Sequence, residues 1–234
     1  MHINIQPAEK QRLQDFLEVH SIFYTIQGEG PFAGHPAVFV RLAGCNLQCP
    51  GCDTEYTDNR YPVSAHEVSR AIKTLAYDRR TPGLDAPLVV ITGGEPFRQD
   101  IAKLVRMLTS GGCRVQIETN GTLFVEGLPW DSVTIVCSPK AGKINAKLLP
   151  HIDAFKYVMS ARSVDECDGL PTLALDHSAS PRVARPVPGK PVYLQPMDEQ
   201  DPVLNRANQD ACLASCLRYG YIMQLQIHKF LEVQ

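Results

Sequence analysis

The chain has 234 residues, of which 44% are hydrophobic and 21% charged, and its net charge is −2. This length allows one large α/β domain, and the near-neutral charge excludes a broad basic surface for nucleic acid. No apolar run approaches the roughly 20 residues of a membrane helix, and the first residues do not resemble a signal peptide. We therefore expect a cytoplasmic protein with neither a membrane nor a nucleic-acid partner.

The predicted elements alternate between strands and helices along one domain, 1–234. Residues 1–20 form an N-terminal extension, for which we expect no more than a capping strand or helix. Short apolar runs then end in polar or Gly-rich residues, and the last of them, 221–229, contains His228. Amphipathic helical patterns cover 64–78, 99–112 and 201–220, and the first opens with Ser64 and Glu67 in capping-box spacing. Residues 160–191 are rich in Pro and Ala and indicate a variable excursion.

Strands that alternate with helices predict a parallel sheet. Because only about six such strands are evident, we predict an incomplete, modified TIM-type (β/α) barrel. Polar residues follow the strands as Thr92–Glu95, Glu118–Asn120, Ser138–Lys140, Gln195–Asp198 and His228–Lys229. The carboxyl ends of parallel strands form the face that binds ligands, so we expect a large site there. The alternative is that these residues are only turns and helix caps.

Three cysteines stand close together in the stretch RLAGCNLQCPGCDTEYT, residues 41–57. Cys45, Cys49 and Cys52 have the spacing C-x3-C-x2-C on a predicted loop. Thiolates select zinc or iron–sulfur clusters, and three ligands suit a cluster with one iron open to a small molecule. A zinc site completed by His35 or by a distant cysteine is the alternative. The other five cysteines are scattered, and we expect most of them to be buried, unreactive thiols.

This cysteine spacing matches the signature of the radical S-adenosylmethionine (SAM) superfamily. Within it, the chain resembles the 7-carboxy-7-deazaguanine synthases through YTIQGEGPFAGHPAVFVRLAGCNLQCPGCDT, TGGEP, IETNGT, CSPK, QPMD and the terminal QIHKFLEVQ. These pieces run in family order from about residue 22 to the end. One departure is Gly51, because superfamily members often carry an aromatic residue just before the third cysteine.

The resemblance implies a lyase of queuosine (7-deazapurine) biosynthesis. Such enzymes convert 6-carboxy-5,6,7,8-tetrahydropterin into 7-carboxy-7-deazaguanine and ammonia, using a 4Fe–4S cluster, SAM and Mg²⁺. The radical comes from the cofactor, so no further catalytic side chain is implied, and the protein orients the reactants and excludes side reactions. The resemblance also implies a homodimer and a reductant such as flavodoxin or ferredoxin.

The resemblance assigns residues to these tasks. Cys45, Cys49 and Cys52 hold the cluster, and Thr54 is the magnesium ligand. SAM-binding positions are matched by Gly93, Gly94, Glu118, Ser138, Pro139, Lys140, Gln195, Pro196, Met197 and Asp198. Substrate-binding positions are matched by Ile26, Gln27, Gly28, Glu29, Arg41, Thr92, His228 and Gln234, the last through its terminal carboxylate. An Arg suits the pterin carboxylate because it donates two parallel hydrogen bonds.

Two other functions fit part of the pattern. An activase that makes a glycyl radical on a partner protein would share the cysteine loop and TGGEP, but would leave QGEG, CDT and the closing HK without a role. A zinc- or cluster-stabilised binding module would need no open coordination position.

Overall fold

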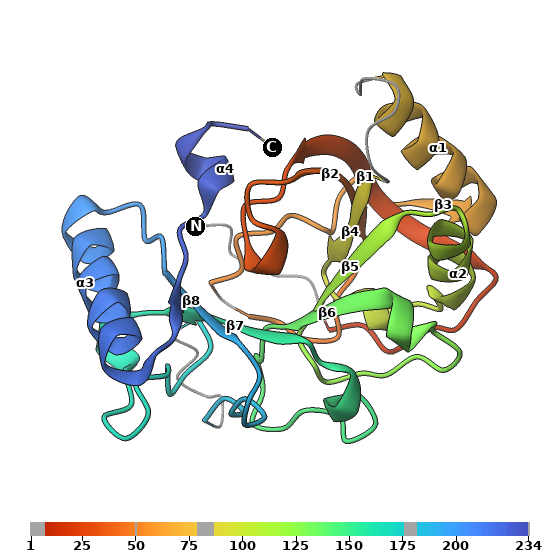
Figure 1. Cartoon of the computed structure of the whole chain (residues 1–234). Helices are drawn as coiled ribbons and strands as arrows, with labels where there is room; N and C mark the ends of the chain where they lie inside the picture. The colour runs from red at the N-terminus through yellow and green to blue at the C-terminus, as the bar shows by residue number, and fades with distance from the viewer. Residues whose placement is uncertain (1–7, 50, 79–86, 176–181, 234) are drawn as a thin grey trace.

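One nine-stranded sheet, in the order β3-β1-β2-β4-β5-β6-β7-β8-β9, forms the centre of the computed structural model, which describes residues 8–49, 51–78, 87–175 and 182–233. The strands are β1 Phe16–Ile26, β2 Pro36–Leu42, β3 Tyr61–Ser64, β4 Leu88–Gly93, β5 Arg114–Thr119, β6 Val133–Cys137, β7 Ala154–Met159, β8 Val192–Pro196 and β9 Ile222–Met223. Strands β2, β4, β5, β6, β7, β8 and β9 pair in parallel with their neighbours in this order. Strand β1 pairs antiparallel with both β2 and β3. The sheet curves without closing (Figure 1), which confirms the predicted incomplete barrel.

The three predicted helices are present. They are α1 Ala65–Asp78, α2 Ala102–Ser110 and α3 Pro202–Tyr219. The capping box forms at α1, where the Ser64 N–H and hydroxyl donate to the Glu67 carboxylate at 3.0 and 2.7 Å. At α3 the Asp201 side chain accepts from two backbone N–H groups of the first turn, and Gly220 ends the helix in the left-handed conformation, φ 77°.

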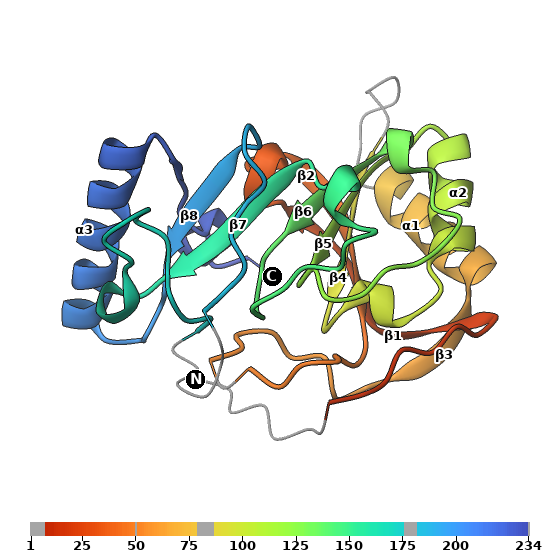
Figure 2. The same cartoon turned by 90° about the horizontal axis from the view of Figure 1, so that it is seen from below.

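The helices cover the outer face of the curved sheet. Helix α1 packs against β1 and α2, helix α2 packs against β5, and helix α3 packs against β8. Figures 1 and 2 show α1 and α2 beside one end of the sheet and α3 beside the other. The central strands are buried on both sides, as the fully apolar and buried run 88–91 of β4 illustrates. The loops that follow these strands are left free to form a site.

Short 3-10 helices replace α-helices in the connections around β6 and β7. They are η3 Trp130–Ser132, η4 Leu149–His151 and η5 Ala161–Ser163, while η1 Gly30–Phe32 and η2 Pro96–Arg98 follow β1 and β4. The expected excursion 160–191 contains η5 and an isolated bridge between Val164 and Pro171, and part of it lies outside the described residues.

The C-terminal strand is shorter than predicted, and the placement of His228 at a strand end was wrong. Strand β9 pairs with β8 only at Ile222 and Met223, and the last sheet contact is a hydrogen bond from Gln224 N–H to the Leu194 carbonyl at 2.9 Å. The chain then leaves the sheet edge and forms a single helical turn, α4 Ile227–Phe230, which contains His228. An apolar run of this length does not by itself separate a strand from a turn of helix.

The N-terminal extension contributes a strand, because β1 begins at Phe16 within the predicted 1–20 segment. None of the helices in the described ranges is long and apolar enough to cross a membrane.

Candidate active site

A cavity of about 480 Å³ lies at the carboxyl ends of the parallel strands. Most residues with a predicted role line it. They are Ile26, Gln27, Glu29, Arg41, Cys45, Cys49, Cys52, Thr54, Thr92, Gly93, Gly94, Glu118, Ser138, Lys140, Gln195, Met197, Asp198 and His228. Gly28, Pro139 and Pro196 are neighbours of these residues but are not part of the wall. Gln234 lies outside the described residues.

The three clustered cysteines are free thiols on the loop that follows β2. The Cys45 sulfur accepts from the Leu47 N–H at 3.4 Å, and Cys52 N–H donates to the Cys49 carbonyl at 3.2 Å. Burial raises the pKa of all three thiols, that of Cys45 to about 12. A buried thiol becomes a thiolate ligand when a positive metal centre compensates for its charge. This donor set therefore fits an iron–sulfur cluster.

A single zinc ion fits these residues poorly. His35 precedes β2 whereas Cys45 follows it, so the seven-residue strand separates them by roughly 20 Å. Within the described ranges, no three His, Cys, Asp or Glu side chains converge on one point as ligands of a single ion. In a 4Fe–4S cluster each cysteine binds a different iron, so its ligands stand apart.

Of the scattered cysteines, Cys137, Cys212 and Cys216 are buried as expected, whereas Cys113 is half-buried and Cys167 is exposed.

The Gly93–Gly94 pair brings the end of β4 against the end of β2. A Cβ on Gly93 would lie 2.0 Å from the Leu42 carbonyl oxygen, and one on Gly94 would lie 2.1 Å from the Gly44 carbonyl oxygen and 2.9 Å from Cys45 Cβ. A side chain at Gly93 would therefore collide with the end of β2, and one at Gly94 would collide with the backbone that leads into the cysteine loop. The pair belongs to the cavity wall, and its bare backbone leaves room for a ligand beside the thiols.

Glu95 follows the glycine pair and is fully buried. It accepts from the Phe97 N–H at 3.0 Å as the cap of η2. It also accepts from the Thr119 hydroxyl and the Asn120 N–H, each at 2.7 Å. Burial raises the pKa of Glu95 to about 7, against the effect of these three donors. Glu95 thus joins the ends of β4 and β5 beneath the cavity.

A buried lysine connects two of the predicted binding carboxylates. Lys156 on β7 donates to Glu29, and to Glu118 at 2.9 Å, and Gln27 Nε2 donates to Glu118 at 2.9 Å. Burial acts to raise the pKa of Glu29, but the Lys156 ammonium outweighs it and holds that pKa well below its usual range. The floor of the cavity is therefore an ordered array of charges, with carboxylate oxygens that can accept from a pterin.

Arg41 lies in the cavity wall. Its Nε is buried and has no hydrogen-bond partner among the described residues, and its guanidinium carbon lies 5.3 Å from the centre of the Phe23 ring, which itself stacks on Phe39. Burial lowers the pKa of Arg41 because few groups replace its lost hydration. Gln195 Oε1 is likewise buried without a partner in the cavity wall. Buried polar atoms without partners indicate positions where a ligand completes the hydrogen bonds.

The residues after β6 and β8 face the thiols from the other side. Lys140 Nζ donates to the Ser138 hydroxyl at 2.5 Å, and burial together with Lys156 lowers the pKa of Lys140. Asp198 accepts a hydrogen bond from the Gln200 N–H at 3.0 Å. This bond has the largest effect on the pKa of Asp198, and together with the bonds from Asn205 and Lys229 it lowers that pKa to about 2.

The C-terminal segment 224–230 closes one side of the cavity. Three alternate side chains contact the predicted substrate turn: Gln224 Oε1 accepts from Gly30 N–H at 2.8 Å, Gln226 Nε2 donates to Glu29 at 2.7 Å, and His228 packs on Gly28. A Cβ on Gly28 would lie 2.2 Å from His228 Nδ1, so Gly28 makes room for the imidazole ring. Lys229 Nζ pairs with Asp198 at 3.1 Å and with Asp53 at 3.9 Å.

Sequence reasoning missed Lys156 and Gln226 as wall residues. Lys156 left a signal, because a charged residue within the apolar run 154–159 of a buried strand needs a partner. Gln226 left none, since a glutamine near a chain end is ordinary. Thr54 is in the wall, where its hydroxyl donates to Asp53 at 3.3 Å.

Comparisons with known proteins agree with this geometry. Residues 40–129 match the family model of the radical SAM superfamily. The 7-carboxy-7-deazaguanine synthase of Rhodospirillum rubrum is 46% identical over 224 residues, covering 93% of this chain and 92% of that protein. The one from Rickettsia prowazekii is 42% identical, covering 93% and 89%.

The fold has a solved counterpart in the crystal structure of QueE from Escherichia coli. It aligns with a TM-score of 0.65 at 23% identity and covers 90% of this chain and 94% of that one. Because the curated relatives are similar over nearly the whole length, the chain belongs to the 7-carboxy-7-deazaguanine synthase family of radical SAM enzymes.

Proposed function

We propose that this enzyme converts 6-carboxy-5,6,7,8-tetrahydropterin into 7-carboxy-7-deazaguanine and ammonia in the cytoplasm, as a step of queuosine biosynthesis. The observation that carries the proposal is one cavity lined by three free thiols, by an arginine whose buried Nε has no partner among the described residues, and by the carboxylates of Glu29, which is buried, and Glu118. Thiols suit a cluster, the arginine suits a carboxylate, and the carboxylates suit the N–H groups of a pterin. The names of the relatives support the same reaction.

The cofactor side of the cavity holds the cluster and SAM. Cys45, Cys49 and Cys52 hold the cluster, and when both groups are bound they supply one-electron chemistry that removes a hydrogen atom from the substrate. Gly93, Gly94, Glu118, Ser138, Pro139, Lys140 and residues 195–198 bind SAM in this proposal. Lys140 suits its carboxylate, and the free Gln195 oxygen accepts from its hydroxyl or amino groups.

The substrate side is formed by residues 26–29, Arg41, Thr92 and His228, with Gln234 at the chain end. Arg41 binds the pterin carboxylate, while Glu29, held ionised by Lys156, accepts from its ring donors. Burial lowers the pKa of His228, so its imidazole is neutral at pH 7 and can either donate or accept a hydrogen bond. Thr54 offers a hydroxyl oxygen to Mg²⁺, which prefers such hard donors and retains water and substrate oxygens.

The whole chain acts as one radical SAM domain, and we propose that it works as a homodimer with a flavodoxin or ferredoxin as reductant. A glycyl-radical activase would need the cavity to admit a protein segment, whereas segment 224–230 covers one side of it. A binding module would not need a buried arginine whose Nε has no partner among the described residues of the cavity wall.

Anaerobic turnover tests the proposal. Protein reconstituted with iron and sulfide receives SAM, reductant, Mg²⁺ and the carboxylated tetrahydropterin, and mass spectrometry detects 7-carboxy-7-deazaguanine. We expect product from the wild type and from Cys113→Ala, but none from Cys49→Ala. Cys113 lies just before β5, at the amino ends of the parallel strands, whereas the cavity lies at their carboxyl ends. SAM cleavage without product would assign another substrate. A loaded cluster with neither reaction would overturn the catalytic role.

A further inference from the structure

The N-terminal segment 8–12 lies against the start of the cysteine loop, defined here as residues 45–60. The backbone N–H of Glu9 donates to the Cys45 carbonyl at 2.8 Å, and the N–H of Arg12 donates to the Arg98 carbonyl at 2.6 Å. Arg12 also forms an isolated parallel bridge with Gln99. The extension therefore contacts the backbone of a predicted cluster ligand directly.

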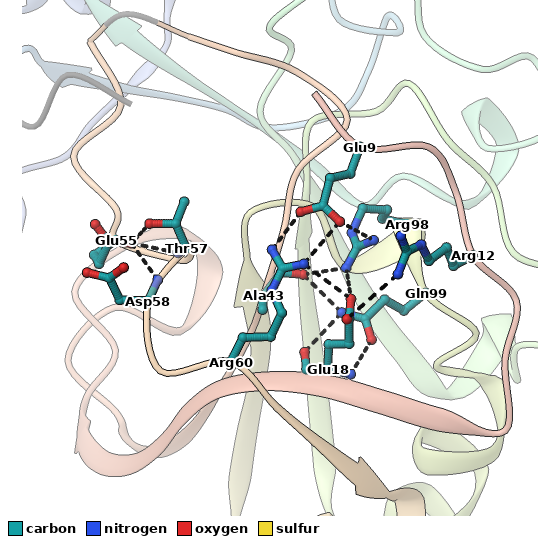
Figure 3. A network of polar contacts seen from close by, with 10 residues as sticks. All are labelled: Glu9, Arg12, Glu18, Ala43, Glu55, Thr57, Asp58, Arg60, Arg98 and Gln99. Atoms are coloured by element: carbon teal, nitrogen blue, oxygen red, sulfur yellow. Dashed lines mark hydrogen bonds and ion pairs between the residues drawn. The ribbon is translucent and has the colours of Figure 1, made fainter. Parts of the chain in front are cut away.

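The Glu9 carboxylate joins two arginines from distant parts of the chain (Figure 3). Arg60 donates to it through both terminal nitrogens, at 3.2 and 2.6 Å, and Arg98 Nη1 donates at 3.0 Å. The Arg98 side chain has no exposed surface. The bonds from Arg60, followed by the Arg98 charge, hold the pKa of Glu9 below its usual range, although partial burial opposes this. Charge-assisted pairs of this kind are among the stronger hydrogen bonds in proteins.

Arg98 also holds the residues just before the loop. Its Nη2 donates to the Ala43 carbonyl at 2.8 Å and to the Glu18 carboxylate at 2.6 Å. A Cβ on Gly44 would lie 2.7 Å from the Arg98 guanidinium carbon, so the guanidinium lies directly on the Gly44 backbone. The Gly44 carbonyl in turn accepts from Glu95 N–H at 3.0 Å. The backbone that leads into the loop is therefore held on several sides.

The described residues of the cysteine loop form no helix or strand. Contacts with other parts of the chain therefore contribute to holding the loop in place.

Glu9 contacts both ends of this loop, Cys45 through its backbone and Arg60 through its carboxylate. Joining the ends of a loop lowers the conformational entropy lost when the residues between them become ordered. We infer that Glu9 is a positioning residue for the iron–sulfur cluster, because it clamps the cysteine loop at its base and keeps the three thiols in place. This inference rests on the proposed function only in taking these thiols as the cluster ligands.

The test compares Glu9→Ala and Glu9→Gln with the wild type in the full-length chain. The reconstituted proteins are exposed to a chelator under anaerobic conditions, and the loss of cluster absorbance is followed with time. We expect Glu9→Ala to lose its cluster about tenfold faster, since the charge-assisted bonds from Arg60 and Arg98 no longer oppose opening of the loop. Glu9→Gln keeps a neutral acceptor and should fall between the two. Glu126→Ala is the matched control, because its carboxylate pairs with Lys147 on the surface.

Two further measurements separate positioning from a general loss of stability. The electron paramagnetic resonance spectrum of the reduced cluster, with and without SAM, should become heterogeneous in Glu9→Ala. Amide hydrogen exchange of the cluster-free protein should be faster in residues 45–60 and unchanged in β5 and β6. A lower melting temperature with wild-type cluster lifetime, spectrum and exchange would overturn the inference, and Glu9→Gln decides if Glu9→Ala does not fold.

The outcomes for the two proposals are distinct. A wild type that binds a cluster but makes no product overturns the proposed reaction, while the effect of Glu9 on cluster lifetime is still measured. A wild type that binds no cluster overturns both.

Discussion

Segment 8–12 and segment 224–230 both lie against loops of the site, and different chemistry holds them in place. The first is fixed by charges, since Glu9 and Glu18 surround the unexposed guanidinium of Arg98. The second is held by neutral side-chain amides, an imidazole and the partly exposed ion pair of Lys229 with Asp198, and its Leu225 and Phe230 remain exposed. Removing one charge from a buried cluster leaves its partners without compensation, whereas losing one amide contact costs much less. We therefore expect the proposed cofactor side to stay fixed and the proposed substrate side to adjust, and four experiments examine that contrast.

The largest effect should come from Arg98→Met. Loss of the guanidinium leaves Glu9 and Glu18 without their shared buried partner, so we expect the free energy of unfolding to fall by about 3–5 kcal/mol. Urea unfolding of the cluster-free protein measures this change. Arg12→Met is the control, because Arg12 is 53% exposed and lies 3.9 Å from Glu18, and it should change stability by less than about 0.5 kcal/mol. Equal, small losses in both variants would remove the contrast between the two segments.

The pH dependence of stability should reveal Glu95. Because its pKa is about 7 when folded and 4.5 in the reference state, the folded protein binds this proton more tightly. The resulting stability is fully present below pH 4.5 and is lost as the pH rises to about 7. Between these values, wild-type unfolding free energy should fall relative to Glu95→Gln by about 1–3 kcal/mol. Denaturant unfolding of both proteins across this range decides it, and parallel curves would contradict the raised pKa.

Gly28→Ala should act on the C-terminal side. The new methyl group would collide with His228, so we expect the free energy of unfolding to fall by about 1–3 kcal/mol. The KM for the pterin should increase more than the KM for SAM. The double variant with His228→Ala should recover most of the stability, because it removes the other partner of the collision. Thermal unfolding of the four proteins in the cycle provides the measurement. If the two single effects simply add, the residues do not press on each other.

Of the four tested changes, Lys229→Ala should have the smallest effect. Lys229 and Asp198 are each 35% exposed at the side chain, so we expect a loss below about 1 kcal/mol that disappears in concentrated salt. Lys147→Ala, which breaks a more exposed pair with Glu126, should be smaller still. A salt-independent loss at Lys229 would show that segment 224–230 is held as firmly as segment 8–12.

The fold and the cavity were predictable because they follow from local patterns. Apolar strands alternate with amphipathic helices, and polar residues such as Thr92 and Ser138 come where strands end, so their common edge could be inferred without coordinates. The cysteine spacing was equally local. These features depend on neighbours in the sequence, which a single chain displays.

The clamp at the loop base could not be predicted in this way. Glu9 and Arg98 are 89 positions apart, and nothing in either neighbourhood specifies the other. The C-terminal turn was missed for a related reason, since four residues of helix are too few to show a period and β9 pairs over only two residues. Both features depend on which distant segments meet.

The cavity draws its wall from residues as early as Phe23 and as late as Lys229. During synthesis on a ribosome, the cysteines emerge long before the strands and the C-terminal turn that enclose them. The site therefore cannot form until nearly the whole chain has been made. We therefore expect delivery of iron and sulfide to this enzyme to be a late event of its maturation.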